Sequence, residues 1–500
     1  MKQKNLLFIS SLAVVAFAVR LFRIGSQSLW VDEILTLGQS IPDPGLTIWD
    51  YLKYNIHGAI HSFVVYLCHF VSMNDGWLRF PSAVAGALGV VYFYRWVQVW
   101  LGDRIATTAS VLLVVHPLHV YYSQEVRNYS FLFFFAMVSN FYLHRILSKE
   151  TPRHFSLYVV GIVGAALSNF AAAFLYVVHA IIYLFRKNIS IRRVLRWVIV
   201  SIFILILLSP WIYRIYVVID VARLVTPVMP GQLTTTERLR GETTVGPEAV
   251  PYLFYVYSVG FSLGPSLREL HLDATMANVL WKHWPTVLGV VLVFGVLGVA
   301  GAVHIVRCRL PWVQVGLYLF VPIIFTLLLC WQNAKAFNVR YVLLGLPAYL
   351  CLVAAGVLSV KGAWRYTTAA LVLATLIFSL GNYYFNGRYA REDVRGAARE
   401  IAERAAPADC ILTHTVTEVF EHYFDGPNPV HSVFAPPGTP LERVDQQVEG
   451  LFANCDTVWY LRAREWVADP EGYLVGELDR RYHQAELIEL NGVTLYRYIR

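Results

Sequence analysis

Long apolar stretches alternate with short polar connections over the first 385 residues of the chain. A stretch of about 17 to 25 apolar residues is long enough to cross a bilayer as a helix. Eleven stretches are predicted to cross: 5 to 22, 80 to 101, 105 to 122, 129 to 147, 155 to 169, 171 to 186, 195 to 214, 285 to 306, 311 to 331, 340 to 359 and 365 to 385. The run from Ile60 to Val71 is too short, and predicts a helix that lies in or dips into the membrane interface.

The pattern changes after Phe385, where charged residues become frequent and apolar runs become short. A helix is expected over Asp393 to Arg404, and strands are expected at Cys410 to Thr413, Thr457 to Leu461 and Val493 to Tyr498. This mixture predicts a small α/β domain. We therefore expect a transmembrane domain over residues 1 to 386 and an α/β domain outside the membrane over residues 387 to 500.

Composition supports a membrane protein and excludes several other classes. Hydrophobic residues make up 57% of the chain and charged residues only 15%, whereas a soluble globular protein has about 25% charged residues. Soluble enzymes, disordered scaffolds and small disulfide-rich proteins are thereby excluded. The net charge of +8 needs a separate explanation, which the position of the basic residues provides.

Lysine and arginine fall on one side of the predicted membrane domain, and that side is the cytoplasm by the positive-inside rule. The residues that set the orientation are Lys2, Lys4, Arg104, Lys149, Arg153, Arg186, Lys187, Arg192, Arg193, Arg196, Arg307, Arg309, Lys361 and Arg365. The outer loops are then 23 to 79, 122 to 129, 215 to 284 and 332 to 339, and the C-terminal domain is also outside. The expected location is the cytoplasmic (inner) membrane with a cytoplasmic N-terminus, and a periplasmic C-terminal domain in a Gram-negative cell. Because most of the positive excess is cytoplasmic, no nucleic-acid partner is expected.

The first span also resembles a signal peptide, since Ala16-Phe17-Ala18 has the small residues of a cleavage site. A retained helix is favoured because Arg20 and Arg23 close the apolar run.

The chain has six cysteines and no pair separated by two residues. Cys410 and Cys455 each begin a predicted strand in a compartment that permits disulfides. A disulfide and two free core thiols both fit this sequence. The other four cysteines lie in apolar segments and are interpreted as packing residues.

Two groups of acids are candidates for chemistry on the outer side. Asp32 and Glu33 follow Trp30 in the first outer loop, and an ordinary solvated acidic pair is the alternative interpretation. Glu125 and Arg127 lie before Tyr129 in a very short turn between two predicted spans. Charges at that depth are costly unless they are paired or functional, so this pair either stabilises the turn or contributes to a site.

A basic cluster follows in the outer loop at 332 to 339 and the helix after it, formed by Lys335, Arg340 and Tyr341. It could anchor the helix at lipid headgroups, but arginine beside hydrogen-bonding side chains also suits a lipid-linked phosphate. His57 and His61 have helical spacing in the first outer loop but no acid at a matching offset, so no metal site is predicted there.

Five short motifs occur in order along residues 5 to 385: Arg20-Leu21 with Trp30-Val31-Asp32-Glu33, Leu78-Arg79-Phe80-Pro81-Ser82-Ala83, Tyr122-Ser123-Gln124-Glu125-Val126-Arg127-Asn128-Tyr129, Gly260-Phe261-Ser262-Leu263-Gly264-Pro265-Ser266, and Arg340-Tyr341 with Leu346-Pro347. The set resembles the GT-C glycosyltransferases, specifically the bacterial family 39 proteins related to protein O-mannosyltransferases and aminoarabinose transferases. The resemblance implies the GT-C fold, a polytopic α-helical membrane protein with interfacial helices in the first outer loop. One motif departs from the family, which commonly has His-Pro-Pro-Leu-Tyr where this chain has His57-Gly58-Ala59-Ile60-His61. The helix that follows is therefore expected to start differently.

The resemblance implies a polyprenyl-phosphate sugar as donor and Asp32 as catalytic base. A polyprenyl phosphate leaves as a monoester whose second pKa is about 6, so its departure needs little acid catalysis. The protein must then accept the proton of the acceptor and stabilise charge on the phosphate. We expect inversion at the anomeric carbon in a single displacement, with Asp32 as base and with Glu33 and Glu125 beside the reaction.

The remaining candidate residues fall into two groups. The expected phosphate-binding residues are Arg127, Lys335, Arg340 and Tyr341, and the residues expected to shape the donor or acceptor site are Trp30, His57, His61 and Tyr129. No cofactor is expected apart from the lipid-linked donor, and a divalent cation held by the acids is left open. The expected partners are membrane lipid, the lipid-linked donor and a protein, lipid or polysaccharide acceptor.

Two other classes remain as alternatives. A transporter or flippase of lipid-linked sugars would place polar groups near the middle of the membrane, whereas Arg95, Arg145 and Arg214 lie towards the ends of spans. A glycan polymerase or ligase would use a large outer loop and basic residues without the Asp-Glu pair. The sequence identifies neither the sugar nor the acceptor.

Overall fold

The computed structural model describes residues 2–42, 45–47, 58–185, 190–218, 248–272, 276–331, 337–433, 449, 455–469 and 471–500. The chain divides into two compact units, each with its own hydrophobic core. The first comprises Met1–Ile24, Leu37–Pro265 and Val279–Tyr383, and the second comprises Gly25–Thr36, Ser266–Asn278 and Tyr384–Arg500. The boundary expected between residues 386 and 387 lies close to the last point at which the chain passes from the first unit to the second, between Tyr383 and Tyr384. Two segments from the predicted outer loops also belong to the second unit.

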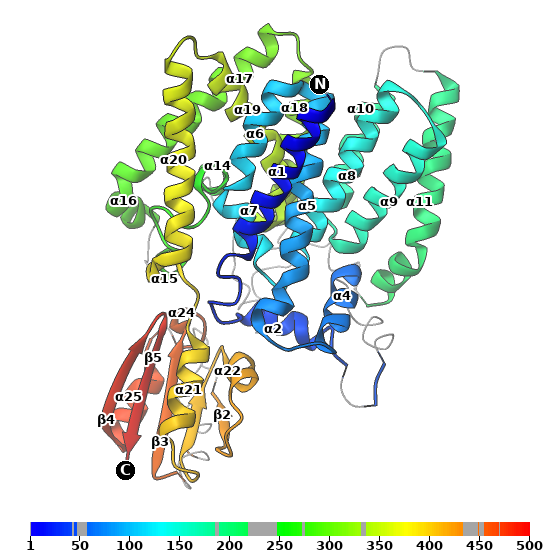
Figure 1. The fold of residues 1–500 in the computed structure, drawn as a ribbon. Coiled ribbons are helices and arrows are strands. Elements are labelled where there is room, and N and C mark those ends of the chain that lie inside the picture. Colours follow the sequence, from blue (N-terminus) through cyan, green and yellow to red (C-terminus); the bar gives the residue numbers. More distant parts are fainter. Residues whose placement is uncertain are drawn as a thin grey trace. The chain divides into compact units, whose positions relative to one another are not determined.

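The first unit is a bundle of helices (Figure 1). Its helices are α1 (Lys2–Leu21), α4 (Ala59–His69), α5 (Asp75–Leu101), α6 (Asp103–Val114), α7 (Pro117–Ser123), α8 (Tyr129–Ser148), α9 (Pro152–Ser168), α10 (Ala172–Leu184), α11 (Ile191–Val218), α14 (Ala249–Val259), α16 (Met276–Val290), η1 (Val291–Gly295), α17 (Val296–Arg307), α18 (Trp312–Trp331), η2 (Val339–Gly345), α19 (Leu346–Ser359) and α20 (Trp364–Phe385).

Each of the eleven predicted spans lies on one or more of these helices. Within the described residues, seven helices are long and apolar enough to cross a membrane, or eight if the bent pair α6 and α7 forms one span. The predicted interfacial segment is the 11-residue helix α4, which is too short to cross. The expected polytopic α-helical fold is confirmed.

A proline breaks the third predicted span, 105 to 122, into α6 and α7, which are bent by 59°. Pro117 is the first residue of α7, and His116 before it has an extended backbone with ψ of 117°. A proline disfavours the helical conformation in the residue before it. The break therefore ends α6 at Val114, and α7 leads at Ser123 into the turn that carries Glu125.

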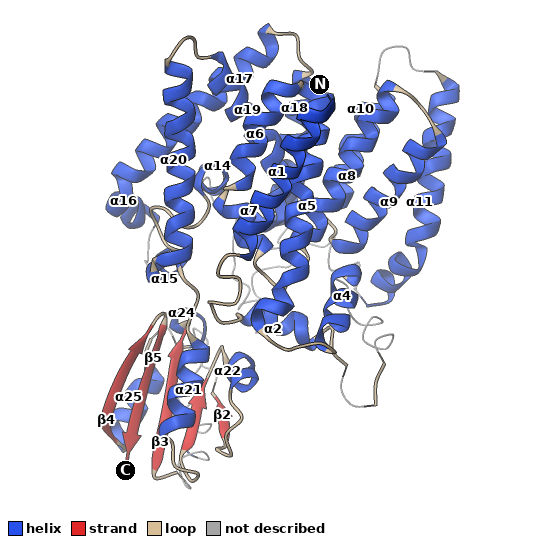
Figure 2. Cartoon of the chain, in the orientation of Figure 1, coloured by secondary structure: helices blue, strands red, loops and turns tan. Residues whose placement is uncertain are grey.

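The second unit contains a five-stranded sheet with the order β2-β1-β3-β5-β4, and Figure 2 shows that all the strands drawn belong to this unit. The strands are β1 (Cys410–Thr413), β2 (Val430–Ser432), β3 (Thr457–Ala463), β4 (His483–Leu490) and β5 (Val493–Ile499). Strand β1 is parallel to β2 and β3, and β5 is antiparallel to β3 and β4.

Helices complete the second unit: α2 (Val31–Gly38), α15 (Leu267–Leu272), η3 (Gly387–Tyr389), α21 (Val394–Arg404), α22 (Thr417–Tyr423), α24 (Glu465–Ala468) and α25 (Tyr473–Arg481). Leu474 and Leu478 of α25 pack with Leu412 and Tyr460 on one face of the sheet. Helix α21 covers the other face (Figure 1), where Arg404 lies 5.7 Å from the centre of the Trp459 ring.

The expected helix and three strands of this unit are present. Asp393 caps α21 by accepting a hydrogen bond of 2.9 Å from the Gly396 amide. The sequence pattern did not reveal β2 and β4. Strand β2 has only three residues, and β4 is an edge strand with alternating polar positions and no apolar run.

Cys410 and Cys455 form a disulfide, with Cα atoms 5.9 Å apart. The bond joins the first residue of β1 to the segment that enters β3, the strand beside it. Of the two alternatives that the sequence allows, the structure therefore contains the disulfide.

Helices α17 and α19 pack closely because each presents a glycine at the contact. A methyl group added to Gly301 would overlap the carbonyl oxygen of Leu352, and one added to Gly356 would overlap the carbonyl oxygen of Leu297. Small residues at such crossings let helix backbones approach each other in membranes.

Gly301→Ala should destabilise the first unit by about 1 to 3 kcal/mol, because the helices must separate to admit the methyl group. Gly298→Ala, on the same helix, is the matched control, since nothing lies within 4 Å of its added methyl group. Thermal unfolding of the two purified variants in detergent measures the difference. Equal melting temperatures would show that the contact does not limit stability.

Candidate active site

The acidic pair lies at the start of helix α2 in the second unit. The carbonyl of Trp30 accepts the first helical hydrogen bonds, from the amides of Glu33 and Ile34. The Glu33 side chain reaches back, and its Oε2 accepts a hydrogen bond of 3.3 Å from the Trp30 amide. This is one half of a capping box, in which an acid in the third helical position satisfies the amide before the helix.

Glu33 is completely buried and forms an ion pair with Arg391, whose Nη1 lies 2.5 Å from Oε2. The Arg391 side chain is 7% exposed. Its guanidinium also lies 5.8 Å from the centre of the Trp30 ring, and that of Arg464 lies 5.4 Å from the same ring. Because a buried carboxylate needs a charged or hydrogen-bonding partner, Glu33 has a structural role in this arrangement.

Asp32 differs from its neighbour because it is partly exposed. It lies in the first turn of α2, where the helix dipole favours negative charge. Its backbone carbonyl accepts a hydrogen bond of 2.9 Å from the Thr36 hydroxyl one turn later. Of the two acids, Asp32 is therefore the more exposed.

The segment before α2 is bound by residues of the C-terminal part of the chain. The Tyr423 hydroxyl accepts a hydrogen bond of 2.7 Å from the Leu29 amide. The Arg395 guanidinium donates to the carbonyls of Gly25 and Ser26, at 3.2 and 2.8 Å. The loop that carries Asp32 is thus held on both its backbone and its side chains.

The second candidate acid, Glu125, lies in the first unit in the turn between α7 and α8, and is completely buried. The Tyr122 hydroxyl interacts electrostatically with both Glu125 and Arg340. The rings of Tyr122 and Tyr129 lie 5.0 Å apart. Tyr129 therefore packs against Tyr122, and Glu125 and the sequence-distant Arg340 lie within electrostatic range of the same hydroxyl.

Arg340 and Tyr341 follow Val339 in the first turn of the short helix η2, which Asn338 caps by accepting a hydrogen bond of 3.1 Å from the Arg340 amide. The Arg340 guanidinium lies 5.4 Å from the centre of the Tyr341 ring. Both side chains are partly exposed. Lys335, the third member of the predicted basic cluster, lies outside the described residues.

Arg127 and His61 meet at Ser82 of α5. The Ser82 hydroxyl donates a hydrogen bond of 3.3 Å to the Arg127 carbonyl and lies 3.5 Å from Nε2 of His61. The Arg127 guanidinium lies 5.7 Å from the centre of the Tyr129 ring. His61 is buried, which suits a packing role better than a ligand role. His57 lies outside the described residues.

Gly58 precedes α4 in a left-handed conformation, with φ of 67°. Proline cannot adopt this angle, since its ring fixes φ near −65°. A side chain there would also overlap Asn128, whose amide donates to the Ser168 carbonyl at 2.7 Å. The helix therefore starts in a way that the family's Pro-Pro sequence does not permit.

Three buried side chains hold the chain where it leaves α1, and sequence reasoning assigned them no role. Gln124 Nε2 donates to the carbonyls of Arg20 and Phe22, at 2.7 and 2.8 Å. Arg79 Nη1 donates to the Ile24 carbonyl at 3.0 Å. Arg20 itself donates to the carbonyl of Ala16 and to the imidazole of His119. The signal was present, because Arg20, Arg79 and Gln124 are polar residues inside the family motifs.

Within the described part of the chain, the group spaced to hold a metal ion is Cys410, His431 and Cys455. Both sulfur atoms are in the disulfide. This group therefore does not offer thiolate ligands, and it contains none of the candidate acids.

Buried ionisable groups in the second unit are strongly influenced by their environment. Burial alone would raise the pKa of Glu392, but the charge and hydrogen bond of Arg464 hold it below its usual value. Burial, together with the charge of the nearby Arg462, lowers the pKa of His414 to about 4 against the opposing charge of Glu465. His414 is therefore neutral at physiological pH.

The helical arrangement is that of the GT-C fold. The structure is similar to ArnT from Cupriavidus metallidurans bound to undecaprenyl phosphate, with a TM-score of 0.56 and 13% sequence identity over 99% of this chain and 98% of that chain. Apo ArnT from the same organism has a TM-score of 0.53 with the same identity and coverage. The oligosaccharyltransferase AglB from Archaeoglobus fulgidus is less similar, with a TM-score of 0.48 and 13% identity over 98% of this chain and 74% of that chain.

Residues 57–213 match the family model for dolichyl-phosphate-mannose-protein mannosyltransferase. None of the curated proteins matches the chain. The family match over residues 57–213 and the shared fold agree with the class that the five motifs indicated, the GT-C glycosyltransferases.

Glu33→Ala should destabilise the packing of residues 25 to 40 by about 3 to 5 kcal/mol, since it leaves the Arg391 charge buried without this carboxylate. Asp32→Ala, one residue away and partly exposed, should change the stability of this segment by less than about 1 kcal/mol. Hydrogen exchange of peptides from residues 25 to 40 under increasing denaturant measures both. Similar losses for the two variants would contradict the structural role assigned to Glu33.

The second unit should lose stability between pH 6.5 and pH 4 because of His414. Its pKa is lowered from 6.5 to about 4 in the folded state, so the unfolded chain binds a proton first as the pH falls. The full effect is about 3 kcal/mol. His414→Asn should flatten this part of the stability profile, whereas the control His483→Gln, at an exposed position, should not. Unfolding followed at pH 7 and pH 5 tests this.

Proposed function

We propose that this protein transfers a sugar from a polyprenyl-phosphate donor to an acceptor at the outer face of the cytoplasmic membrane, with inversion and with Asp32 as the catalytic base. The observation that supports this proposal most directly is the difference in burial between the two adjacent acids. Glu33 is buried against Arg391, while Asp32 is partly exposed at the start of the same helix. Only Asp32 can then take a proton from a bound acceptor.

The donor assignment rests on chemistry and on similarity. ArnT, which shares the fold, is described in complex with undecaprenyl phosphate. In this chain Arg340 and Tyr341 are partly exposed at the start of η2, and Arg127 is partly exposed in the turn before α8. Guanidinium groups suit phosphate because they offer several donors in a planar fork. We assign these residues, with Lys335, to the phosphate of the donor.

The reaction is a single displacement. The acceptor oxygen or nitrogen forms a bond to the anomeric carbon while the bond from that carbon to the phosphate oxygen breaks. The electron pair leaves with the polyprenyl phosphate, and the acceptor proton passes to the carboxylate of Asp32. Since the base activates the acceptor by taking its proton and the cations stabilise the phosphate as it leaves, no second acid is required to protonate the leaving group.

Glu125 is proposed to act within the first unit rather than as a second base. It is completely buried and shares the environment of Tyr122 with Arg340. A carboxylate there orients the cation that binds the phosphate. Tyr129, whose ring packs on Tyr122, and the Arg127 guanidinium over it shape the same region.

A divalent cation is not required by this proposal. The pairing of Glu33 with Arg391 argues against a cation shared by Asp32 and Glu33, because a cation would compete with the arginine for the same oxygen. In this proposal the basic side chains stabilise the negative charge of the phosphate in place of a metal ion.

The protein is proposed to lie in the cytoplasmic membrane with the N-terminus inside and the second unit outside. The basic residues of the short loops support this orientation. The disulfide between Cys410 and Cys455 supports it independently, since disulfides persist in oxidising compartments.

Asp32→Asn should abolish transfer, with a loss of about 100-fold to 10,000-fold, because the isosteric amide cannot accept the proton. The experiment compares cells that lack the gene with cells that carry the wild type or the variant at equal expression. Mass spectrometry of envelope glycolipids, glycoproteins and polysaccharides measures the product. One sugar on one class of acceptor should be missing both without the gene and with Asp32→Asn.

The control is Asp456→Asn, which removes a carboxylate of the second unit that is 93% exposed and should leave the product unchanged. Wild-type levels of the product in Asp32→Asn cells would refute the base assignment. A flippase would be indicated if Asp32→Asn cells had wild-type levels of the product while cells that lack the gene lost several outer-face sugars.

A further inference from the structure

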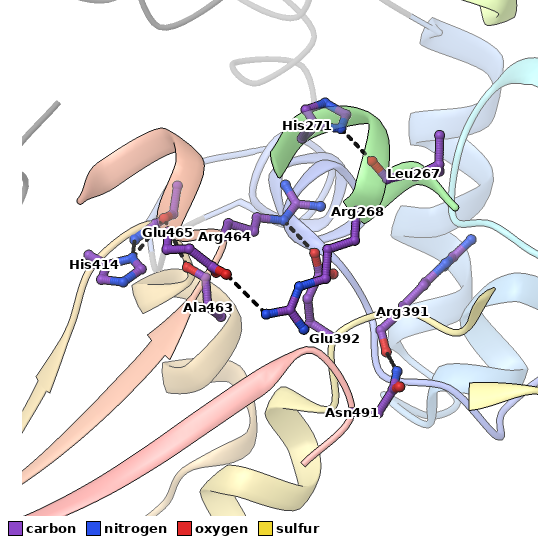
Figure 3. A network of polar contacts seen from close by, with 11 residues as sticks. Leu267, Arg268, His271, Arg391, Glu392, His414, Ala463, Arg464, Glu465 and Asn491 are labelled. Carbon is purple, nitrogen blue, oxygen red and sulfur yellow. Dashed lines mark hydrogen bonds and ion pairs between the residues drawn. The ribbon is translucent and has the colours of Figure 1, made fainter. Parts of the chain in front are cut away.

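The parallel strands β1 and β3 end at the same edge of the sheet in the second unit. This edge is where open α/β sheets usually bind ligands, beyond the carboxyl ends of their strands. Here His414 follows β1, and Arg464 and Glu465 follow β3. Figure 3 shows that this edge carries a network of polar contacts to other parts of the same chain.

Two segments from the long outer loops occupy this network. Arg268 of α15 forms an ion pair with Glu465, with Nη2 and Oε1 3.0 Å apart (Figure 3). Arg464 pairs with Glu392 at 2.8 Å and lies 5.4 Å from the centre of the Trp30 ring. The loop that carries Asp32 therefore contacts the edge of the sheet at which other open α/β sheets bind their ligands.

Arg391 is the residue that connects this network to the acidic pair. Its backbone is fixed at both ends: its amide donates to Gln27 Oε1 at 3.1 Å, and its carbonyl accepts from Asn491 Nδ2 at 2.8 Å. Its side chain contacts Glu33 and the Trp30 ring. Glu33, directly after Asp32, and Trp30, two residues before it, are thus both contacted by one arginine, which lies 358 residues from Glu33 in the chain.

We propose that Arg391 is a positioning residue of the transfer reaction, which fixes the helix α2 and so the direction of the Asp32 carboxylate. This rests on the proposed function, in which Asp32 is the base. Arg391 contacts no reacting atom, and it acts through Glu33 and Trp30. The C-terminal part of the chain is then required for catalysis because it supplies Arg391, whether or not it also binds the acceptor.

The energetics favour a clamp over a passive ion pair. Both partners are buried, so loss of one leaves the other charge with a large desolvation penalty and drives the helix start to rearrange. A base must lie within hydrogen-bond distance of the proton that it takes. A displacement of about 1 Å can reduce a rate by about 100-fold. Arg391 therefore controls turnover through geometry.

Hydrogen exchange of the purified full-length protein in detergent tests the local effect without a donor or acceptor. In Arg391→Ala, amides of residues 25 to 40 should exchange at least tenfold faster, while peptides from β1, β3 and the first unit keep wild-type rates. The matched control is Arg404→Ala, which removes the ion pair with Glu486 in the same unit and should leave residues 25 to 40 unchanged. Faster exchange throughout the second unit would show a general stabilising role and overturn the proposal.

Product formation in cells, measured as for Asp32→Asn, tests the catalytic consequence. Arg391→Ala should lower it at least tenfold at equal expression, and Arg404→Ala should stay within twofold of wild type. Arg391→Lys retains the charge and should recover part of the loss. If Arg391→Ala does not accumulate in membranes, Arg391→Lys is compared with wild type instead, by hydrogen exchange of residues 25 to 40 and by product formation. Wild-type values for both would overturn the positioning role.

A double-mutant cycle gives an independent check. If Arg391 acts through Glu33, then Glu33→Gln with Arg391→Gln should be no worse than the poorer single variant, because coupled residues are not additive. Additive losses, or wild-type product in Arg391→Ala, would overturn the positioning role. If Asp32→Asn itself has no effect, the proposed function fails, and the exchange result still shows whether Arg391 holds the helix.

Discussion

The second unit depends on the burial of a charged carboxylate. Glu33 is fully shielded from solvent, and such a group is stable only with a cation and hydrogen-bond donors around it. Arg391 supplies the cation and the Trp30 amide supplies a donor. These partners come from different ends of the chain, so the loop beginning at Gly25 must pack on the C-terminal segment for the charge to be satisfied.

The same constraint organises the start of that loop in the first unit. Arg20 and Arg79 are buried arginines whose observed partners are mainly backbone carbonyls, such as those of Ala16 and Ile24. A guanidinium has five donors, and a turn of chain leaving a helix has carbonyls without helical partners. The arginines therefore fix the point at which α1 ends. Buried arginines thus fix this segment of the chain within the first unit, through Arg20 and Arg79, and within the second unit, through Arg391.

Much of the fold could be predicted from the sequence, and the reasons for the exceptions are physical. Apolar runs identified the helices because a bilayer requires about 20 apolar residues in succession. They could not reveal β4, where polar residues alternate along an exposed edge. The Asp32–Glu33 pair and the Arg340 cluster were selected as candidates from residue type and position. The partnership of Glu33 with Arg391 was not, since nothing local marks one arginine of a charged segment as the partner of a distant acid.

Helix geometry explains why two adjacent acids have different roles. Successive residues in an α-helix point roughly 100° apart, so Asp32 and Glu33 cannot face the same group. Here Glu33 faces the packed side of α2, and Asp32 lies at a partly exposed position. The third helical position is the one from which a side chain can reach back to the amide before the helix, and Glu33 occupies it with the longer side chain. The shorter Asp32 is left at the accessible position. An exchange to Glu-Asp would therefore remove the cap and also change the reach of the acid proposed as base, which makes the order of the two acids a requirement of the fold.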